Sequence, residues 1–498
     1  MIELSYPGEL TDADNLAVQL AATGLSGDAC ESKSRLLAQA ARVLSAMGGE
    51  RPASPLPLGE GPGVRAAGHG HHPSPLPTNL RLVPGEGTVS GPPMAFFVPG
   101  RIEVLGKHTD YAGGRTMVAT AERGFCMVAR PRGDQQMVVI DARTGETVRF
   151  AIDPELKPQV DSWSNYPMTV ARRMARNFPG ACRGADIALV SDLPPAAGMS
   201  SSSAFMVGVF LVLSEVNRLP ARDEYWHNIG NQTDLAGYLG TVENGQSFGK
   251  LSGDRGVGTF GGSEDQTAIL CAEPNQISQY SFCPVEFEKL LPVPPGYVFA
   301  IGASGVVAEK TGAAREKYNT ASRLATALAE IWRRETGRDD PHLAAALGSS
   351  PDAPARLKAI VRAGVPGEFT AEALLTRLEH FMVESGEIIP AAGDALSAGD
   401  LRAFGRLVDR SQHATEHLLG NQVPETVFLA ASARRLGAAA ASAFGAGFGG
   451  SVWALVEAAR ADDFLAAWAG EYGSQFPQHV PLASFFATGA GPAAFRVC

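Results

Sequence analysis

Residues 99–114 read PGRIEVLGKHTDYAGG, a short strand pattern that runs into a dense polar turn. The strand carries Arg101, and the turn then gathers Lys, His, Thr, Asp and Tyr side chains within residues 107–111. Together these side chains offer several hydrogen-bond donors and acceptors to a polyhydroxylated ligand. Taken alone, the stretch is equally typical of a polar surface loop, since such loops are common.

A second stretch, PPAAGMSSSSA at residues 194–204, lies between an alternating strand pattern at 185–193 and an apolar run expected to form a buried helix. Small residues let the backbone approach a phosphate, and the free N–H groups at a helix start favour an anion. Serine hydroxyls can also reach a magnesium ion, which prefers oxygen ligands. No lysine follows the glycine, so a P-loop is disfavoured. A serine-capped helix start without a ligand is the alternative.

The remaining pattern mixes strands and helices in two blocks. Short β-rich runs begin at Met94, and a second strand–helix series begins at Gly296. This second series ends in GAGFGG at 445–450 and a strand that we expect to be the last of the chain. The glycine-rich stretch alone predicts only a tight turn. The two blocks predict an α+β protein with two lobes and a cleft between them.

Composition limits the function classes. The 498 residues are 45% hydrophobic and 19% charged, which is typical of a globular protein with a large core. The formal charge of −10 argues against a nucleic-acid partner, and no apolar run is long enough to predict a membrane span. Six cysteines form no CxxC pair, and the acidic first residues do not resemble a signal peptide. We therefore expect a cytoplasmic protein with reduced thiols.

The composition changes abruptly between Arg51 and Pro93, a segment that holds ten Pro and eight Gly. Such a segment cannot bury enough apolar surface to fold, so we expect a disordered insertion. Before it, residues 34–47 have apolar side chains at helical spacing. The expected organisation is an N-terminal helical segment (1–50), the insertion (51–93), a first domain (94–290) and a second domain (291–498).

In this order and spacing, the three stretches resemble the signature motifs of the GHMP kinases. The first is similar to the galactokinase form GRVNLIGEHTDYNGG, which marks the sugar 1-kinase branch. Segments that also resemble galactokinases are WSNYPMTVARRM (163–174), GGSEDQ (261–266) and AREKYN (314–319). The resemblance implies a two-lobed fold with an N-terminal ribosomal-protein-like domain, a C-terminal ferredoxin-like domain and an active site between them.

The implied activity is ATP-dependent phosphorylation of a monosaccharide at its anomeric C1 hydroxyl, with galactose as the expected sugar. ATP is the expected co-substrate, and Mg²⁺ is the expected metal ion. The sugar and ATP are the expected partners, with no nucleic acid or membrane. We expect a monomer.

The resemblance also implies roles for individual residues. The catalytic pair is Asp265, which takes the proton from the anomeric hydroxyl or orients it, and Arg101, which pairs with that aspartate. The expected sugar-binding residues are Lys107, His108, Asp110, Gly262 and Tyr318. The expected ATP-binding residues are Trp163, Gly198, Ser200, Ser201, Ser202, Ser203, Gly447 and Gly449. The expected metal ligands are Ser202 and Glu243. For Trp163, ordinary core packing is the alternative.

Lys107 departs from the pattern, because galactokinases have a glutamate there that accepts a hydrogen bond from the C6 hydroxyl. Lysine has no acceptor, but it can bind a carboxylate at C6. A kinase for a sugar acid such as galacturonate is therefore an alternative if Lys107 points into the site. A sensor that binds sugar and ATP without turnover is another alternative, although Ser200–Ser203, Asp265 and Arg101 are all present. The sugar-type first motif disfavours homoserine and mevalonate kinases.

Overall fold

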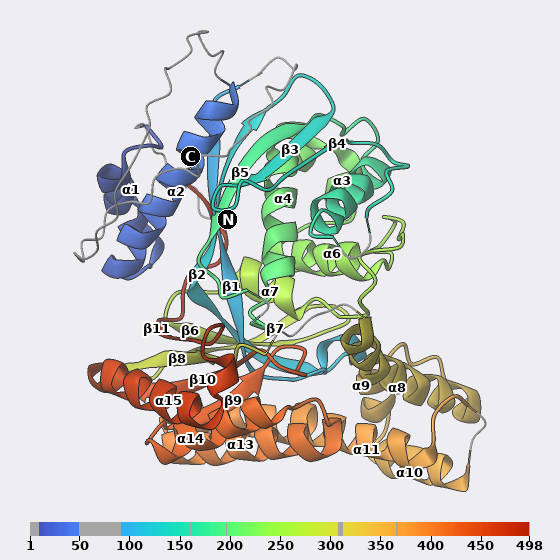
Figure 1. Cartoon of the computed structure of the whole chain (residues 1–498). Coiled ribbons are helices and arrows are strands. Elements are labelled where there is room, and N and C mark those ends of the chain that lie inside the picture. The colour runs from blue at the N-terminus through green and yellow to red at the C-terminus, as the bar shows by residue number, and fades with distance from the viewer. Residues whose placement is uncertain are drawn as a thin grey trace.

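Two β-sheets organise the chain, and helices cover both faces of each (Figure 1). The computed structural model describes residues 9–48, 91–159, 162–195, 197–306, 312–364 and 367–497. The insertion expected at 51–93 lies almost wholly outside these residues, so its disorder stays a prediction. No helix in the described ranges combines the length and apolarity needed to cross a membrane.

The first sheet has the strand order β12-β1-β2-β5-β3-β4, and β6 extends it by pairing with β2 and with β7. Its strands are β1 (Met94–Leu105), β2 (Arg115–Pro131), β3 (Gln136–Asp141), β4 (Thr147–Ala151), β5 (Ala185–Ser191), β6 (Gln276–Ser281), β7 (Glu286–Pro292) and β12 (Phe495–Arg496). All pairs are antiparallel except β3 with β5. The short strand β12 returns the last described residues to the edge of the first sheet.

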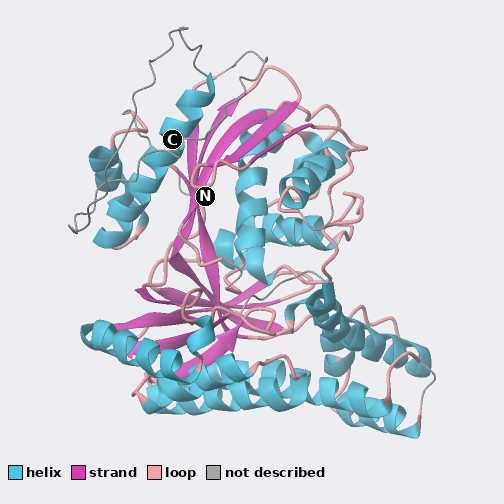
Figure 2. Cartoon of the chain, in the orientation of Figure 1, coloured by secondary structure: helices cyan, strands magenta, loops and turns pink. Residues whose placement is uncertain are grey.

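Helices bury both faces of this sheet, which explains why β1 begins with an unbroken apolar run. Phe96 and Val98 pack against one helical layer, whereas Ala95 and Phe97 pack against the other. The first layer contains α3 (Asn165–Asn177), α4 (Ser201–Asn217), α6 (Gln232–Asn244) and α7 (Glu264–Cys271). The second contains α1 (Ala13–Leu20) and α2 (Gly27–Gly48), on the opposite side in Figure 2. Successive strand residues point to opposite faces, so each face receives its own core.

The helix predicted at 34–47 is confirmed as part of α2, which begins earlier, at Gly27. The apolar helix after the serine stretch is confirmed as α4. Short helical turns connect the longer elements; they include α5 (Asp223–Trp226) and the π-helical segments Met382–Ile388 and Thr415–Leu419.

The second sheet is antiparallel, with the order β11-β8-β10-β9. Its strands are β8 (Tyr297–Ala303), β9 (Ala440–Phe444), β10 (Ser451–Glu457) and β11 (Ser484–Thr488). One face packs on α14 (Pro424–Arg435) and α15 (Ala461–Gln475), and the other on α12 (Ile389–Ser397) and α13 (Leu401–Ala414). The expectation that the strand after the glycine-rich turn is the last one is wrong, because β11 and β12 follow it.

A third helical group follows β8 in the sequence, precedes α12, and lies beside the second sheet (Figure 1). It comprises α8 (Gly312–Thr336), α9 (Leu343–Gly348), α10 (Ala353–Ala363) and α11 (Ala371–Phe381). Trp332, Leu357 and Leu378 are buried in a core of their own, which also includes Ala112 of the first motif. This contact places the helical group against the turn that follows β1.

Strand β1 runs from the first core into the core of the second sheet. Phe96 belongs to the first core, whereas Ile102 and Val104 pack with residues of β8 and β10. Its pairing with β2 shifts register between Pro99 and Arg101 and again between Glu103 and Leu105. β-Bulges re-aim side chains, and they are common beside active sites. Arg101 and Glu103 therefore lie where the strand passes from one lobe to the other.

Candidate active site

A cavity lies where the three sequence motifs meet, and we call it the catalytic cavity. It is lined by Arg101, Glu103, His108, Asp110, Tyr111, Gly198, Ser200, Glu243, Asn244, Thr259, Gly261, Gly262, Glu264, Asp265, Gln266, Tyr318, Gly445 and Ala446. The fold thus brings together nine of the predicted site residues, from β1, the turns after β1 and β5, α6, the loop before α7, α7 and α8. Its lining does not include Lys107, Trp163, Ser201, Ser202, Ser203, Gly447 or Gly449.

Arg101 and Asp265 form a direct ion pair. Arg101 Nε and Nη2 donate to Asp265 Oδ1 at 2.8 and 2.5 Å. Burial alone lowers the pKa of Arg101, but the neighbouring carboxylates of Asp265 and Glu264 reverse this and raise it. The arginine is therefore permanently charged and holds the Asp265 carboxylate at the cavity wall. Asp265 is partly accessible, with 16% of its side chain exposed, as a group that meets a ligand must be.

Two further carboxyl groups surround the same arginine, and the sequence analysis missed both. Glu264 Oε1 lies 3.1 Å from Arg101 Nε, and Glu103 Oε2 lies 3.7 Å from Arg101 Nη2. Burial raises the pKa of both carboxyl groups, and that of Glu264 is raised well above its usual range, secondly by the charge of Glu103. Both shifts favour a carboxyl pair that keeps a proton between its two groups, because a hydrogen bond between two carboxyls requires one. One arginine thus faces Asp265 and a carboxyl pair that shares a proton.

We expect Glu264→Gln to stabilise the protein at alkaline pH. The folded pKa of Glu264 lies above its unfolded value of about 4.3, so the stability linked to its proton is complete below that pH and is lost as pH rises through the folded pKa. Glutamine keeps a neutral hydrogen-bond donor in the same place, so the variant does not lose this stability as pH rises. The melting temperature of the variant should exceed that of the wild type by about 2 °C or more at pH 9 and match it near pH 5. Exposed Glu335→Gln is the control; equal shifts at both pH values would contradict the protonated state of Glu264.

The expected sugar-binding residues line one wall of the catalytic cavity. Burial raises the pKa of Asp110, against the effect of the Glu264 N–H, which donates to Asp110 Oδ2 at 3.1 Å. A Cβ on Gly262 would lie 2.4 Å from the same oxygen, so only glycine fits there. The His108 ring lies 5.0 Å from that of Tyr318, centroid to centroid. This wall offers carboxylate, imidazole and phenol groups, which suit a ligand with several hydroxyls.

The turn that carries these groups is fixed by residues outside the first motif. Gly106 N–H donates to the buried Glu384 carboxylate at 2.8 Å. Arg377, also buried, donates to the carbonyl of His108 and, at 3.2 Å, to the hydroxyl of Tyr111. Helix α11 and the π-helical segment Met382–Ile388 thus position the turn after β1.

Lys107 does not reach the catalytic cavity. Its side chain is fully buried, and Nζ donates to Ser442 Oγ of β9 at 2.9 Å. Ser442 Oγ in turn donates to Gln412 Oε1 at 2.9 Å. The ammonium points neither into the expected sugar site nor outward to solvent, so the geometry gives no support to a direct contact with the sugar.

Glycines bring the second and third motifs into backbone contact on the other side of the catalytic cavity. A Cβ on Gly445 would lie 2.7 Å from the carbonyl oxygen of Gly198. Ser200 has a left-handed φ of 59° just before α4, and its buried hydroxyl has no hydrogen-bond partner among the described residues. An unpaired buried hydroxyl in the cavity wall, beside backbone and a helix start, fits the oxygens of a phosphate.

Ser203, rather than Ser202, meets the predicted metal ligand Glu243. Ser203 Oγ lies 2.8 Å from Glu243 Oε2 and 3.1 Å from Asp265 Oδ2, whereas Ser202 is half-buried in the first turn of α4. Gln266 Nε2 also donates to Glu243 Oε2, at 2.7 Å. Within the described residues, no group of three or more His, Cys, Asp or Glu side chains can hold a metal ion. The oxygens of Glu243, Asp265 and Ser203 suit Mg²⁺ when phosphate oxygens complete its coordination.

Trp163 packs beside the serine stretch but not in the catalytic cavity. Its ring lies 6.0 Å from that of Phe205, one turn beyond the start of α4. Both belong to the core of the first lobe or pack against it. Packing and contact with a nucleotide therefore both remain compatible with its half-buried position.

Comparison with known families supports this arrangement. The GHMP kinases N terminal domain matches residues 165–244, and the GHMP kinases C terminal domain matches residues 393–475. The galactokinase galactose-binding signature matches residues 87–131, which include Arg101 and, of the sugar wall, His108 and Asp110. The three matches fall on the elements that build the catalytic cavity and the second lobe.

Curated relatives are similar over most of their length. The chain is 26% identical to the galactokinase of Roseiflexus sp. (strain RS-1) over 370 residues, which are 74% of this chain and 84% of that protein. It is 28% identical to the galactokinase of Chloroflexus aggregans over 381 residues, 75% of this chain and 86% of that protein.

The fold matches that of a solved relative. The crystal structure of Lactococcus lactis galactokinase complexed with galactose has a TM-score of 0.66 and 24% identity, and the match covers 81% of this chain and 94% of that one. At this identity the likeness shows the fold alone, which is the two-lobed fold expected from the motifs. The chain is a sugar kinase of the GHMP kinase superfamily and belongs to its galactokinase-like branch.

Proposed function

We propose that the protein transfers the γ-phosphoryl group of ATP to the C1 hydroxyl of galactose. The observation that carries the proposal is the Arg101–Asp265 pair, which lies between a wall of sugar-binding groups and the two glycine turns. Galactokinases are also the curated relatives of the chain, and the solved relative is complexed with galactose. The retained pair favours an enzyme over a sugar sensor.

In this proposal, Asp265 accepts the hydrogen bond of the C1 hydroxyl and aligns its oxygen with the γ-phosphorus. Arg101 fixes the Asp265 carboxylate through Oδ1 and leaves Oδ2 next to the Ser203 hydroxyl. An unperturbed aspartate is a weak base at pH 7, so orientation contributes more than proton abstraction. The positive charge of Arg101 also stabilises negative charge that develops on the attacking oxygen.

The phosphates of ATP would lie against Gly198, Ser200 and Gly445. Mg²⁺, held by Glu243 with Ser203 or Asp265, would neutralise phosphate charge during transfer. The Ser200 hydroxyl would donate to a phosphate oxygen, which gives it the partner that it lacks among the described residues. Phosphoryl transfer needs chiefly such positioning and charge neutralisation, and these residues supply both.

The charges around the catalytic cavity favour a neutral sugar over a sugar acid. Glu103, Asp110, Glu243, Glu264 and Asp265 all line the cavity, and the one permanent cation in its lining is held by three of these carboxyls. A uronate carboxylate would enter this field without a free cation to pair with, which costs several kcal/mol for a buried charge. Galacturonate is therefore the weaker candidate.

We expect galactose to be preferred over galacturonate, and Lys107→Met to leave this preference within about three-fold of the wild type. Lys107 lies outside the catalytic cavity, so methionine removes the bond to Ser442 and a charge near Glu103 but leaves the lining of the cavity unchanged. The measurement is kcat/KM for both sugars by ATP consumption. The matched control is Ser442→Ala, which removes the same bond from the other side. A wild type that prefers galacturonate, with Lys107→Met abolishing that preference, would establish the sugar-acid kinase instead.

We further infer a monomeric cytoplasmic enzyme whose partners are the sugar and ATP. The five described cysteines outside the last residue are free thiols, as in a reducing compartment. The net charge of −10 argues against a nucleic-acid partner.

A further inference from the structure

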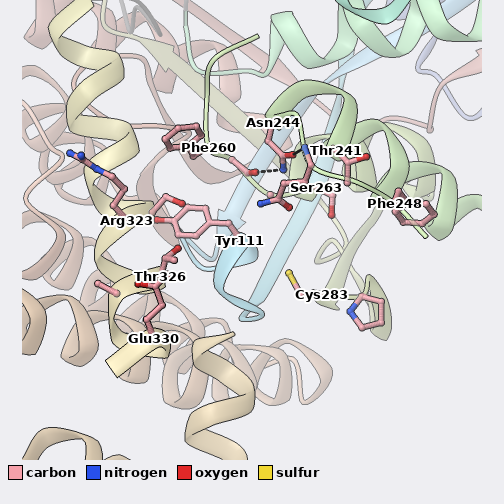
Figure 3. A pocket seen from close by; sticks show the side chains of 18 of the residues that line it. Tyr111, Thr241, Asn244, Phe248, Phe260, Ser263, Cys283, Arg323, Thr326 and Glu330 are labelled. Carbon is pink, nitrogen blue, oxygen red and sulfur yellow. Dashed lines mark hydrogen bonds between the residues drawn. The ribbon is translucent and has the colours of Figure 1, made fainter. Parts of the chain in front are cut away.

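A second, larger cavity lies next to the catalytic cavity, and we call it the outer cavity (Figure 3). Its volume of about 710 Å³ is within the range of pockets that bind small organic ligands, about 300–1,000 Å³. Helix α8 forms one side with Arg323, Thr326 and Glu330, and α6 with the loop before α7 forms the other. Nothing in the phosphoryl transfer described above uses this space.

The two cavities share one wall. Tyr111, Asn244, Gly261 and Gly262 line both of them. Asn244 Nδ2 donates to the carbonyl of Gly261 at 2.8 Å, and this hydrogen bond holds Gly261 in place in the shared wall. At Gly261 a Cβ would lie 2.7 Å from the Tyr318 hydroxyl, so this part of the shared wall has no side chain, and Tyr111 and Asn244 supply the side chains of the rest.

The shared wall is the one that carries sugar-binding groups. Asp265 holds the C1 hydroxyl in the proposed reaction, so Asp110 and Gly262 meet hydroxyls elsewhere on the ring. A group attached to one of those hydroxyl oxygens would extend past Gly262 toward the outer cavity. The shared wall therefore places the outer cavity beside the sugar hydroxyls that are not phosphorylated.

The lining of the outer cavity suits a neutral, polar ring. The aromatic side chains of Tyr111, Phe248 and Phe260 line it together with the polar side chains of Thr241 and Thr326. Phe260 is 48% exposed, so much of its ring is accessible to a ligand. Aromatic faces pack on the C–H faces of a sugar ring, and hydroxyl and amide groups bind its oxygens.

Charges in the outer cavity disfavour an anion such as a nucleotide. Its lining contains two arginines, Arg323 and Arg334, and three acids, Asp234, Glu330 and Glu368. Arg323 Nη1 already lies 3.0 Å from Glu368 Oε1, while its Nε is buried without a hydrogen-bond partner among the described residues.

We propose that the outer cavity binds a second sugar ring attached to the sugar in the catalytic cavity. The substrate is then a disaccharide with galactose at its reducing end, phosphorylated at C1 of that galactose. This proposal rests on the proposed function, from which it takes the reaction. The outer cavity adds the class of substrate. Galactose alone is a smaller substrate that leaves the outer cavity unused.

The test compares galactose with galactobioses linked through O3, O4 or O6 of the reducing ring. We expect kcat/KM for one galactobiose to exceed that for galactose by about ten-fold or more. Thr326→Trp places a bulky ring in the outer cavity, and Thr326 does not line the catalytic cavity. This variant should lower kcat/KM for the preferred galactobiose by about ten-fold and change that for galactose by less than about two-fold. Glu335→Trp, exposed on the same helix and outside both linings, is the matched control.

Calorimetric binding of each galactobiose without ATP separates this inference from the reaction. Phosphorylation of galactose with no binding or turnover of any galactobiose would overturn the outer-cavity proposal and leave the proposed function intact. Binding of a galactobiose that Thr326→Trp weakens, without turnover of any sugar, would support the outer cavity and refute the kinase reaction. An equal fall in kcat/KM for galactose and galactobiose in Thr326→Trp would also overturn the proposal. The substitution would then impair the reaction itself and not the binding of a second ring.

Discussion

Asp265→Asn is expected to lower kcat by about two to four orders of magnitude while the fold stays intact. Asparagine keeps the size of the side chain but loses the charge that accepts the C1 hydroxyl and pairs with Arg101. The arginine keeps the carboxyl pair as its partner, because Glu264 Oε1 lies 3.1 Å from its Nε and Glu103 Oε2 lies 3.7 Å from its Nη2. The melting temperature should therefore change by no more than about 2 °C, and ATP affinity should barely change. The measurements are single-turnover kinetics with galactose, thermal unfolding and nucleotide binding.

The control for this variant is Asp339→Asn, an exposed aspartate outside the lining of the catalytic cavity. It should retain full turnover. Near-normal kcat in Asp265→Asn would remove Asp265 from the mechanism and favour transfer driven by positioning alone. A large fall in melting temperature would show instead that Asp265 is the main partner of Arg101, and that the carboxyl pair does not compensate.

Much of the fold could be predicted because local pattern and tertiary packing agree. The apolar run at the start of β1 indicates a strand buried on both faces, and α4 is apolar all round because it packs within the first core. The last strands were not predicted. β12 has only two residues, too few for a periodic pattern, and it is defined by its pairing with β1.

Site residues were harder to place because their direction depends on single backbone angles. Gly106 and His108 have positive φ angles of 112° and 58°, so strand alternation ends before Lys107 and its side chain turns toward β9. Four consecutive serines likewise cannot show which hydroxyl faces Glu243. Which serine does so depends on where α4 begins. Because α4 begins at Ser201, Ser203 is the serine whose hydroxyl contacts Glu243.

The two additional carboxyls had only a weak signal in the sequence. Glu103 follows Arg101 by two residues on an extended strand, so both side chains share a face. It also stands where the galactokinase form quoted above has asparagine. A lone glutamate in a strand usually faces solvent, and only the contact with Arg101 and Glu264 shows that this one is buried.

Arg101→Met should reduce both catalysis and stability, unlike Asp265→Asn. Methionine keeps the length of the side chain but leaves Asp265, Glu103 and Glu264 without their shared cation in a buried site. Removing one partner of a buried ion pair costs about 3–5 kcal/mol, and loss of the charge that steadies the transition state lowers kcat by about 10²–10³-fold. Thermal unfolding and steady-state kinetics with galactose measure the two effects separately.

The pH dependence of Arg101→Met shows whether the carboxyl groups cause its loss of stability. Without the arginine, the pKa values of Glu103 and Glu264 rise further, because Arg101 is a charge that lowers both. Each carboxyl then favours the folded state only while protonated, so the stability of the variant falls as pH rises above about 4.3. The deficit in melting temperature should be larger at pH 8 than at pH 5, and a second substitution, Glu264→Gln, should restore part of it without restoring kcat. A deficit that is the same at both pH values would mean that Arg101 stabilises the fold by packing, and that the carboxyl groups around it do not need its charge.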